Sequence, residues 1–261
     1  MSEGEVTVSN LEKVYESGEE RTTAIADLSF GVEDGEFMSV VGPSGCGKST
    51  LLYLVAGFLE PTSGTIEVGD RVVHGPGTDR GVVFQDYALF PWKTVMGNVT
   101  YGLEENGLAK EERRETAQRF IDMMGLSGFE DSYPKELSGG MKQRVALART
   151  LAYDPKILLM DEPFGALDQP LREALQDHLL DIWSDLEKTV IFITHDVEEA
   201  VYLSERVMVM TSHPGTKKSV LDIDVDRSQD REAIITSEEY VETKNRVWRS
   251  LREETEPQKS I

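Results

Sequence analysis

A glycine-rich segment of nine residues, Gly42–Thr50, ends in a lysine and two hydroxyl residues, and its sequence GPSGCGKST matches the pattern G-x-x-x-x-G-K-[ST]. Glycines let backbone N–H groups converge on phosphate oxygens without Cβ clashes, and a helix start adds its positive end. Lys48 would neutralise the β- and γ-phosphates, and Ser49 would ligate Mg²⁺. The alternative is an ordinary glycine-rich turn. We expect every residue of this phosphate loop to bind nucleotide: Gly42, Pro43, Ser44, Gly45, Cys46, Gly47, Lys48, Ser49 and Thr50.

Two adjacent carboxylates, Asp161 and Glu162, follow the apolar run Ile157–Met160. Desolvating both at the end of a buried strand is costly unless they serve a partner. Asp161 can hold Mg²⁺ through water, and Glu162 can polarise an attacking water molecule. Such a pair is also found in small-molecule kinases and GTPases, but the chain has no N-K-x-D motif for guanine.

A second candidate anion site is the start of a helix that we expect to run through Ala152. Ser138, Gly139 and Gly140, here called the signature turn, begin this helix in the sequence LSGGMKQR. The free N–H groups of a helix start favour a bound anion. The carboxylate pair alone does not decide between a kinase, a GTPase and an ATPase.

Taken in order, these segments resemble the ATP-binding subunit of ABC transporters. The resemblance covers about residues 5 to 210 and rests on six ordered segments: residues 42–50, Gln85 in VVFQD, Leu137–Gly140, Asp161–Pro163, Ala166–Asp168 and Ile193–Asp196. It implies that two copies face each other head to tail. The signature turn of one copy would then act in trans on the ATP held by the phosphate loop of the other.

The resemblance also assigns roles to single residues. Gln85 would sense Mg²⁺ and water, His195 would contact the γ-phosphate, Asp168 would lie near the dimer seam, and Tyr15 would stack on adenine. Tyr15 has an alternative role as an ordinary strand aromatic. The implied catalytic residues are Glu162, His195, Gln85 and Lys48, and the implied metal ligands are Ser49, Gln85 and Asp161.

Details around these motifs point to one subfamily. Met141 stands where the family most often has Gln, and the segments Leu89–Trp92 and Asn98–Val99 resemble nitrate, sulfonate and taurine importer ATPases. The aromatic segment Tyr87–Trp92 is either core packing or a cup for a helix of a membrane permease. Cys46, at a helix start, is either a reactive thiolate or a small packing residue.

Composition excludes several classes of protein. Acidic residues outnumber basic ones by 48 to 27, which disfavours nucleic acid as a partner. The single cysteine excludes an intramolecular disulfide. The longest apolar run, Leu51–Leu59, is far shorter than the roughly 20 residues of a membrane span. With no secretion signal visible at the start, we expect a cytoplasmic protein, held on the inner face of the membrane through its permease.

The elements that must position these motifs alternate between strands and helices. We expect an α/β fold: a P-loop NTPase core with a mostly parallel sheet, an antiparallel β-rich N-terminal part and a small helical subdomain. The whole chain, 1–261, would be one ABC ATPase domain, with the helical subdomain at about 86–153 and a short C-terminal extension at about 211–261. The expected strands are 65–68, 157–160, 189–194, 206–210 and 220–225, and the expected helices 170–186, 197–203 and 237–251.

The function that this pattern favours is ATP binding and Mg²⁺-dependent hydrolysis that powers an importer for a small anion or organic solute. The partners would be a second ATPase subunit, an integral-membrane permease and, indirectly, a solute-binding protein. One alternative is a soluble ABC-type ATPase that drives another process, such as cluster assembly or DNA work. The other is a P-loop kinase, in which the signature turn would have no role.

Overall fold

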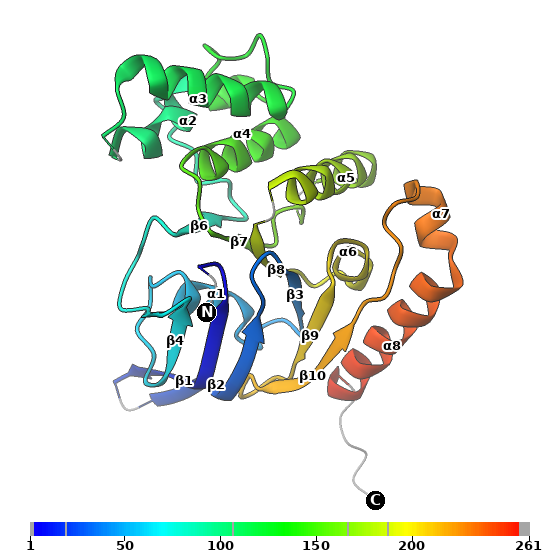
Figure 1. The fold of residues 1–261 in the computed structure, drawn as a ribbon. Helices are drawn as coiled ribbons and strands as arrows, with labels where there is room; N and C mark the ends of the chain where they lie inside the picture. The colour runs from blue at the N-terminus through cyan, green and yellow to red at the C-terminus, as the bar shows by residue number, and fades with distance from the viewer. Residues whose placement is uncertain (1–2, 19, 106, 166, 187, 256–261) are drawn as a thin grey trace, which may run out of the picture. The chain divides into compact units, whose positions relative to one another are not determined.

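The computed structural model describes residues 3–18, 20–105, 107–165, 167–186 and 188–255 (Figure 1). These residues form two compact units: the first contains the described residues up to Gly77 and from Gln176 onward, and the second is Thr78–Leu175. Helix α5 (Gln169–Leu186) begins in the second unit and ends in the first. Among the described residues, no helix combines the length and the apolar character needed to cross a bilayer.

The N-terminal part of the first unit is an antiparallel sheet, as the sequence predicts. Its strand order is β2-β1-β4-β5. The strands are β1 (Val6–Ser17), β2 (Glu20–Val32), β4 (Ser63–Val68) and β5 (Arg71–Val72). Apolar residues alternate along β1, so that Val6 and Val8 are buried while the residues between them are less so. This period of two is what a sheet with one buried face requires.

The parallel part of the first unit is built from mostly apolar strands that are buried except for Arg206 at the start of β9. These are β3 (Phe37–Val41), β8 (Thr189–Ile193) and β9 (Arg206–Met210). Strand β3 pairs in parallel with both β8 and β9. Helix α1 (Lys48–Val55) packs against β8, and helix α6 (Val197–Leu203) packs against β3 and β9. Strands covered by helices read as continuous apolar runs, which is why the sequence locates them well.

The C-terminal extension differs from expectation in two places. Strand β10 is Lys217–Asp222, three residues earlier than predicted, because it pairs antiparallel with β9 in a register that sets Lys217 opposite Met210. Helix α7 (Arg231–Thr236) was not foreseen, and helix α8 is Glu238–Thr255. Figure 1 shows α8 alongside α6 and β10, and α8 contacts both, as well as β9.

The second unit joins a parallel strand pair to a group of helices. Strand β6 (Arg80–Val83) pairs with β7 (Ile157–Asp161). Helices α2, α3 and α4 contact one another and form the helical part, drawn in green in Figure 1. Their bounds are α2 (Val95–Glu105), α3 (Lys110–Met123) and α4 (Gly139–Ala152), with a 3₁₀ turn η1 (Pro134–Glu136) before α4. The first of these helices begins at Val95, so residues 84–94, most of which we expected to belong to the helical subdomain, are an irregular segment.

The core of the first unit predicts a clear effect of one substitution. Phe37 is fully buried, and its ring lies 5.6 Å from that of Trp183, edge to face, and 5.9 Å from that of Phe192. We expect Phe37→Ala to lower the free energy of unfolding by about 3–5 kcal/mol, measured by urea denaturation. Phe58→Ala removes a half-exposed ring and should cost about 1 kcal/mol or less. Equal losses in the two variants would contradict this account of the core.

Candidate functional site

One edge of the first unit carries several of the predicted residues. Strands β3, β8 and β9 are parallel, with Val40 opposite Ile193 and Val41 opposite Val209, so their carboxyl ends share an edge. The phosphate loop follows β3, His195 follows β8 through Thr194, and residues 211–216 follow β9. Ligands of α/β folds bind at this edge. The phosphate loop and His195 therefore both follow strands that end at this edge of the first unit.

The phosphate loop has a backbone that its glycines make possible. Gly45 and Gly47 have φ values of 79° and 96°, in the left-handed region. A Cβ at Gly42 would lie 2.7 Å from the sulfur of Cys46 and 3.0 Å from the carbonyl oxygen of Met210. Larger residues at these positions would distort the loop. Gly47 is the N-cap of α1, so the loop leads directly into the positive end of a helix.

Lys48 holds its charge inside this loop. Its side chain is buried, and Nζ donates to the carbonyl oxygens of Gly42 at 2.8 Å and Pro43 at 3.1 Å. A cation that folds back onto the loop is ready to exchange these neutral acceptors for phosphate oxygens, which bind it more strongly. The loop therefore fits a nucleotide phosphate in both shape and charge.

Cys46 is packed inside the phosphate loop. It is buried beside Gly42, and burial raises the pKa of its thiol, with the nearby ammonium of Lys48 a smaller opposing effect. Of the two interpretations offered by the sequence, burial therefore favours the small packing residue over the stabilised thiolate.

The segment after β9 packs against the phosphate loop, which the sequence analysis did not anticipate. Gly215 N–H donates to the carbonyl of Ala24 at 3.0 Å, and its own carbonyl accepts from Ala26 N–H at 3.0 Å. A Cβ at Gly215 would lie 2.1 Å from the carbonyl oxygen of Cys46. The ring of His213 also lies near the loop, with Cε1 4.0 Å from where a Cβ of Gly45 would be. The only sequence signal was the Pro-Gly pair that follows an apolar strand.

Tyr15 lies beside the first turn of α1. Its hydroxyl is 3.4 Å from Oγ1 of Thr50, and the ammonium of Lys13 lies 5.3 Å from its ring centre. The side chain is 41% exposed, so a ring face is open to a flat base. Stacking on adenine stays a prediction.

In the second unit, Gln85 and the two carboxylates follow neighbouring strands. Val83 of β6 pairs with Met160 of β7, so the residues after both strands lie at one edge. A Cβ at Gly165 would be 3.7 Å from Nε2 of Gln85 and 3.9 Å from Oε2 of Glu162, so both side chains flank this glycine. Glu162 has a φ of 45°, a strained value for a non-glycine residue that is common at functional sites.

The signature turn is a helix start, as predicted. Ser138 is the N-cap of α4, and its Oγ accepts a hydrogen bond from Met141 N–H at 3.3 Å. Gly140 is buried, and a Cβ there would lie 2.6 Å from Leu171. Ser138 and Gly139 are exposed. The departure at Met141 therefore leaves the capping intact, because only its backbone N–H takes part.

Asp168 caps helix α5 and lies close to Leu171. Its Oδ1 accepts from the backbone N–H of Leu171 at 3.1 Å, which caps the start of α5, and the residue is exposed. Of the family motif Ala166–Asp168, Ala166 lies outside the described residues.

The aromatic segment Tyr87–Trp92 stays at the surface of the second unit. The guanidinium of Arg149 binds the carbonyls of Tyr87 and Ala88 at 3.0 and 2.5 Å, and buried Asn98 accepts from Phe90 N–H at 2.8 Å. The Phe90 ring lies 5.8 Å from that of Trp92, which is 71% exposed. Core packing therefore does not explain Trp92.

The fold of the first unit and its phosphate loop define a P-loop ATPase. Residues 25–165 match the family model described as ABC transporter. The chain belongs to the ABC transporter family and is an ATP-binding, ATP-hydrolysing subunit of that family.

Known proteins agree with this assignment. The chain is 53% identical, over 95% of its length and 91% of the relative's, to an uncharacterized ABC transporter ATP-binding protein of Methanocaldococcus jannaschii. It is 51% identical to the nitrate import ATP-binding protein NrtD of Synechocystis, over 84% of the chain and 82% of the relative. A solved dimeric ATP-binding cassette, in a post-hydrolysis state bound to ADP and Pi, has a TM-score of 0.74 and 33% identity, covering 84% of this chain and 98% of that one.

The phosphate loop predicts the effect of an added methyl group. Gly47→Ala would place a Cβ 2.9 Å from the carbonyl of Ala24 in a left-handed backbone. Such a residue costs about 1–2 kcal/mol, and we expect ATP affinity to fall by about tenfold, measured by titration of a fluorescent ATP analogue. Gly75→Ala is the control, because a Cβ there meets nothing within 4 Å. Unchanged affinity in Gly47→Ala would contradict the assigned geometry.

Proposed function

We propose that this chain is the ATPase subunit of an importer for a small anion or organic solute. The observation that carries the proposal is the phosphate loop, with buried Lys48 and left-handed glycines at the carboxyl end of β3. The relative named as a nitrate import ATP-binding protein, which matches most of both chains, supports import and an anionic cargo.

In this proposal the phosphate loop binds the triphosphate and Tyr15 stacks on the adenine. The residues that would hold Mg²⁺ are Ser49, Gln85 and Asp161, whose hydroxyl, amide and carboxylate oxygens are the ligands this cation prefers. When bound, Mg²⁺ neutralises phosphate charge. Lys48 places a second positive charge against the same phosphates, so the loop itself stabilises charge that develops at the leaving group.

The proposed hydrolytic residues are Glu162 and His195. Glu162 accepts a proton from the attacking water, and His195 holds the water and the γ-phosphate. Gln85, beside Glu162 at Gly165, reports the state of the nucleotide. We propose that a second copy supplies its signature turn, Ser138, Gly139 and Gly140, in trans, and that Asp168 lies at the seam between the copies. The dimeric form of the related cassette supports this arrangement.

We further propose that the two units belong to one ABC ATPase domain, with a helical subdomain at about 86–153 and the C-terminal extension at about 211–261. The subunit would be peripheral, held on the inner face of the membrane by its permease, with a solute-binding protein acting only indirectly. The exposed Trp92 beside Phe90 supports a helix-in-groove contact with the permease. The relatives do not favour the non-transport ATPase.

Replacing the proposed base tests the hydrolytic step. We expect Glu162→Gln to keep ATP affinity and to lose phosphate release by a factor of about 10²–10⁴, because an amide cannot accept the proton. Phosphate release and binding of a fluorescent ATP analogue measure the two effects. The variant should also elute as a dimer on gel filtration with MgATP. Elution as a monomer, or wild-type turnover, would refute the assigned role.

The docking surface is tested by removing its exposed ring. We expect Trp92→Ala to reduce copurification with the permease and transport in cells, with the ATPase rate of the isolated chain unchanged. Trp248→Ala removes another exposed tryptophan, from helix α8, and is the control. If transport and assembly survive in Trp92→Ala, the permease binds elsewhere.

A further inference from the structure

Helix α6 begins immediately after the proposed catalytic residue His195, and the C-terminal extension holds it at both ends. At its end, Arg227 donates to the carbonyls of Tyr202 at 2.9 Å and Val201 at 3.3 Å, and also to that of Ser204. These are the carbonyls that a helix end leaves without partners within the helix, and a cation is favoured there. The extension thus supplies the C-terminal cap of α6.

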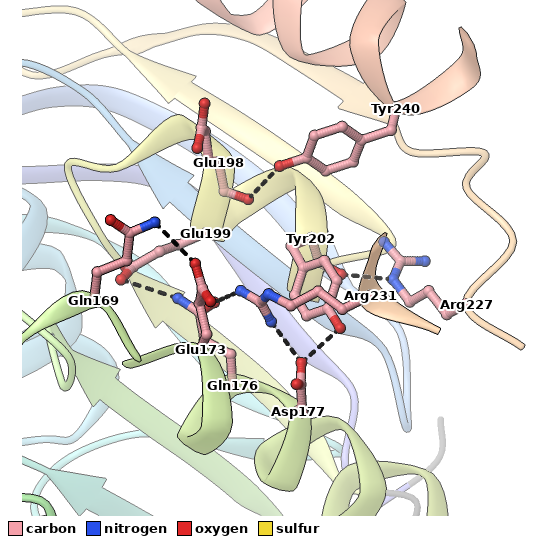
Figure 2. A network of polar contacts seen from close by, with 10 residues as sticks. All are labelled: Gln169, Glu173, Gln176, Asp177, Glu198, Glu199, Tyr202, Arg227, Arg231 and Tyr240. Carbon is pink, nitrogen blue, oxygen red and sulfur yellow. Dashed lines mark hydrogen bonds and ion pairs between the residues drawn. The ribbon is translucent and has the colours of Figure 1, made fainter. Parts of the chain in front are cut away.

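The first turn of α6 is held by helix α8. The hydroxyl of Tyr240 donates to the carbonyl of Glu198 at 3.3 Å, and the ammonium of Lys244 lies 3.2 Å from the Glu198 carboxylate (Figure 2 shows the tyrosine). Tyr240 is buried, and that burial raises the pKa of its hydroxyl, which stays protonated and able to donate. Contacts from the extension therefore reach both ends of a seven-residue helix, whose first turn is also capped by Asp196.

A line of buried polar side chains then connects the extension to the turn that carries His195. Thr194 donates to Oε2 of Glu199 at 2.6 Å, and the Thr194 oxygen accepts from the backbone N–H of Asp196 at 3.0 Å. Gln176 donates to Oε1 of the same carboxylate at 3.2 Å. Thr194, Gln176 and Glu199 are 1%, 2% and 5% exposed. The residues on both sides of His195 are thus fixed to Glu199.

Arg231 of helix α7 completes the line from the other side. Its Nη2 donates to Oε1 of Gln176, and its Nη1 donates to Oδ1 of Asp177 at 2.5 Å (Figure 2). The guanidinium carbon lies 4.1 Å from the ring centre of Tyr202. Tyr202 donates to the same Asp177 oxygen at 2.6 Å, and burial and this bond raise its pKa to about 12. Arginine in a planar, multiply bonded position cannot be replaced by a more flexible cation without loss.

The amide of Gln176 is oriented by its two charged neighbours. Its oxygen faces the cation Arg231, and its NH₂ group faces the anion Glu199. Reversal would set donor against donor and acceptor against acceptor, so the network admits one arrangement. A buried carboxylate adds little net stability, and its retention in such a network is explained by the single geometry that it imposes.

We propose that Arg231, Gln176 and Glu199 are positioning residues for His195, through which the C-terminal extension sets the rate of ATP hydrolysis. The inference rests on the proposed catalytic role of His195. Removing Arg231 frees the oxygen end of Gln176, loosens its grip on Glu199, and lets the Thr194–Asp196 turn move. A small displacement of a catalytic group lowers the rate strongly, whereas the phosphate loop, held by other contacts, keeps its affinity.

The test uses the full chain with MgATP. We expect Arg231→Ala and Gln176→Leu each to lower kcat by about tenfold with an unchanged dissociation constant for a fluorescent ATP analogue. The double variant should be no slower than either single one, because both break the same line. Arg231→Lys should recover part of the rate. The proposal would be overturned if the losses in kcat of the two single variants multiplied in the double variant. It would also be overturned if only KM rose, or if both single variants kept the wild-type kcat.

Two control variants separate positioning from general weakening of the extension. Arg249→Ala removes an α8 arginine whose bond stays within its own helix, at Asn245. Lys218→Ala breaks the link between β10 and the end of α8, where Lys218 contacts Glu253 and Glu254. Both should keep the wild-type kcat. A loss in Lys218→Ala equal to that in Arg231→Ala, at similar thermal stability, would overturn the proposal.

A readout that does not need turnover distinguishes this proposal from the proposed function. The chain has four histidines, and the ring signal of His195 can be assigned in NMR spectra by comparison with His195→Gln. We expect that signal to shift in Arg231→Ala but not in Arg249→Ala. An unchanged His195 signal refutes the positioning role. If the wild-type chain has no ATPase activity but the His195 signal still shifts in Arg231→Ala, only the proposed function is refuted.

Discussion

The convergence of backbone N–H groups on one anion is the constraint on which the rest of the molecule depends. It requires residues without a Cβ where the loop turns on itself, at Gly42, Gly45 and Gly47. It also requires a strand that delivers the loop and a helix that receives it, here β3 and α1. Because β3 pairs in parallel with both β8 and β9, the carboxyl ends of all three strands reach the same edge.

The charge of the whole chain opposes its ligand. The net charge is −21, and ATP is itself an anion, so the long-range field does not favour binding. At physiological salt, however, such fields are screened within about 8 Å. Affinity therefore depends on what lies within contact distance, namely the N–H groups of the loop and a lysine that is already buried there. This explains how a strongly acidic surface and a triphosphate site coexist.

The sequence predicts best those features in which local chemistry and periodicity agree. Helix α6 and strand β9 have the expected bounds, because an N-cap aspartate precedes one and buried apolar residues fill the other. The phosphate loop before helix α1 and the signature turn at the start of helix α4 are also found where the motifs indicate. Strand β10 was displaced, because its position depends on pairing with β9 and not on its own residues.

What the sequence could not show depends on contacts between distant residues. Arg231 meets Gln176 and Asp177 across 55 and 54 positions of the chain, and no local pattern marks either pair. The contact of Gly215 with the phosphate loop is of the same kind. Cys46 was ambiguous because its reactivity is decided by burial, which only the packed structure reveals.

The three tryptophans lie in different surroundings, so one of them can serve as an intrinsic fluorescence probe. The indole N–H of Trp183 donates hydrogen bonds to the carbonyls of Gly35 and Lys188. The guanidinium of Arg252 lies 5.9 Å from the ring centre of Trp248. Trp92, by contrast, is 71% exposed to water. Covering that indole moves its emission to shorter wavelength, so association at this surface can be followed by intrinsic fluorescence without a dye.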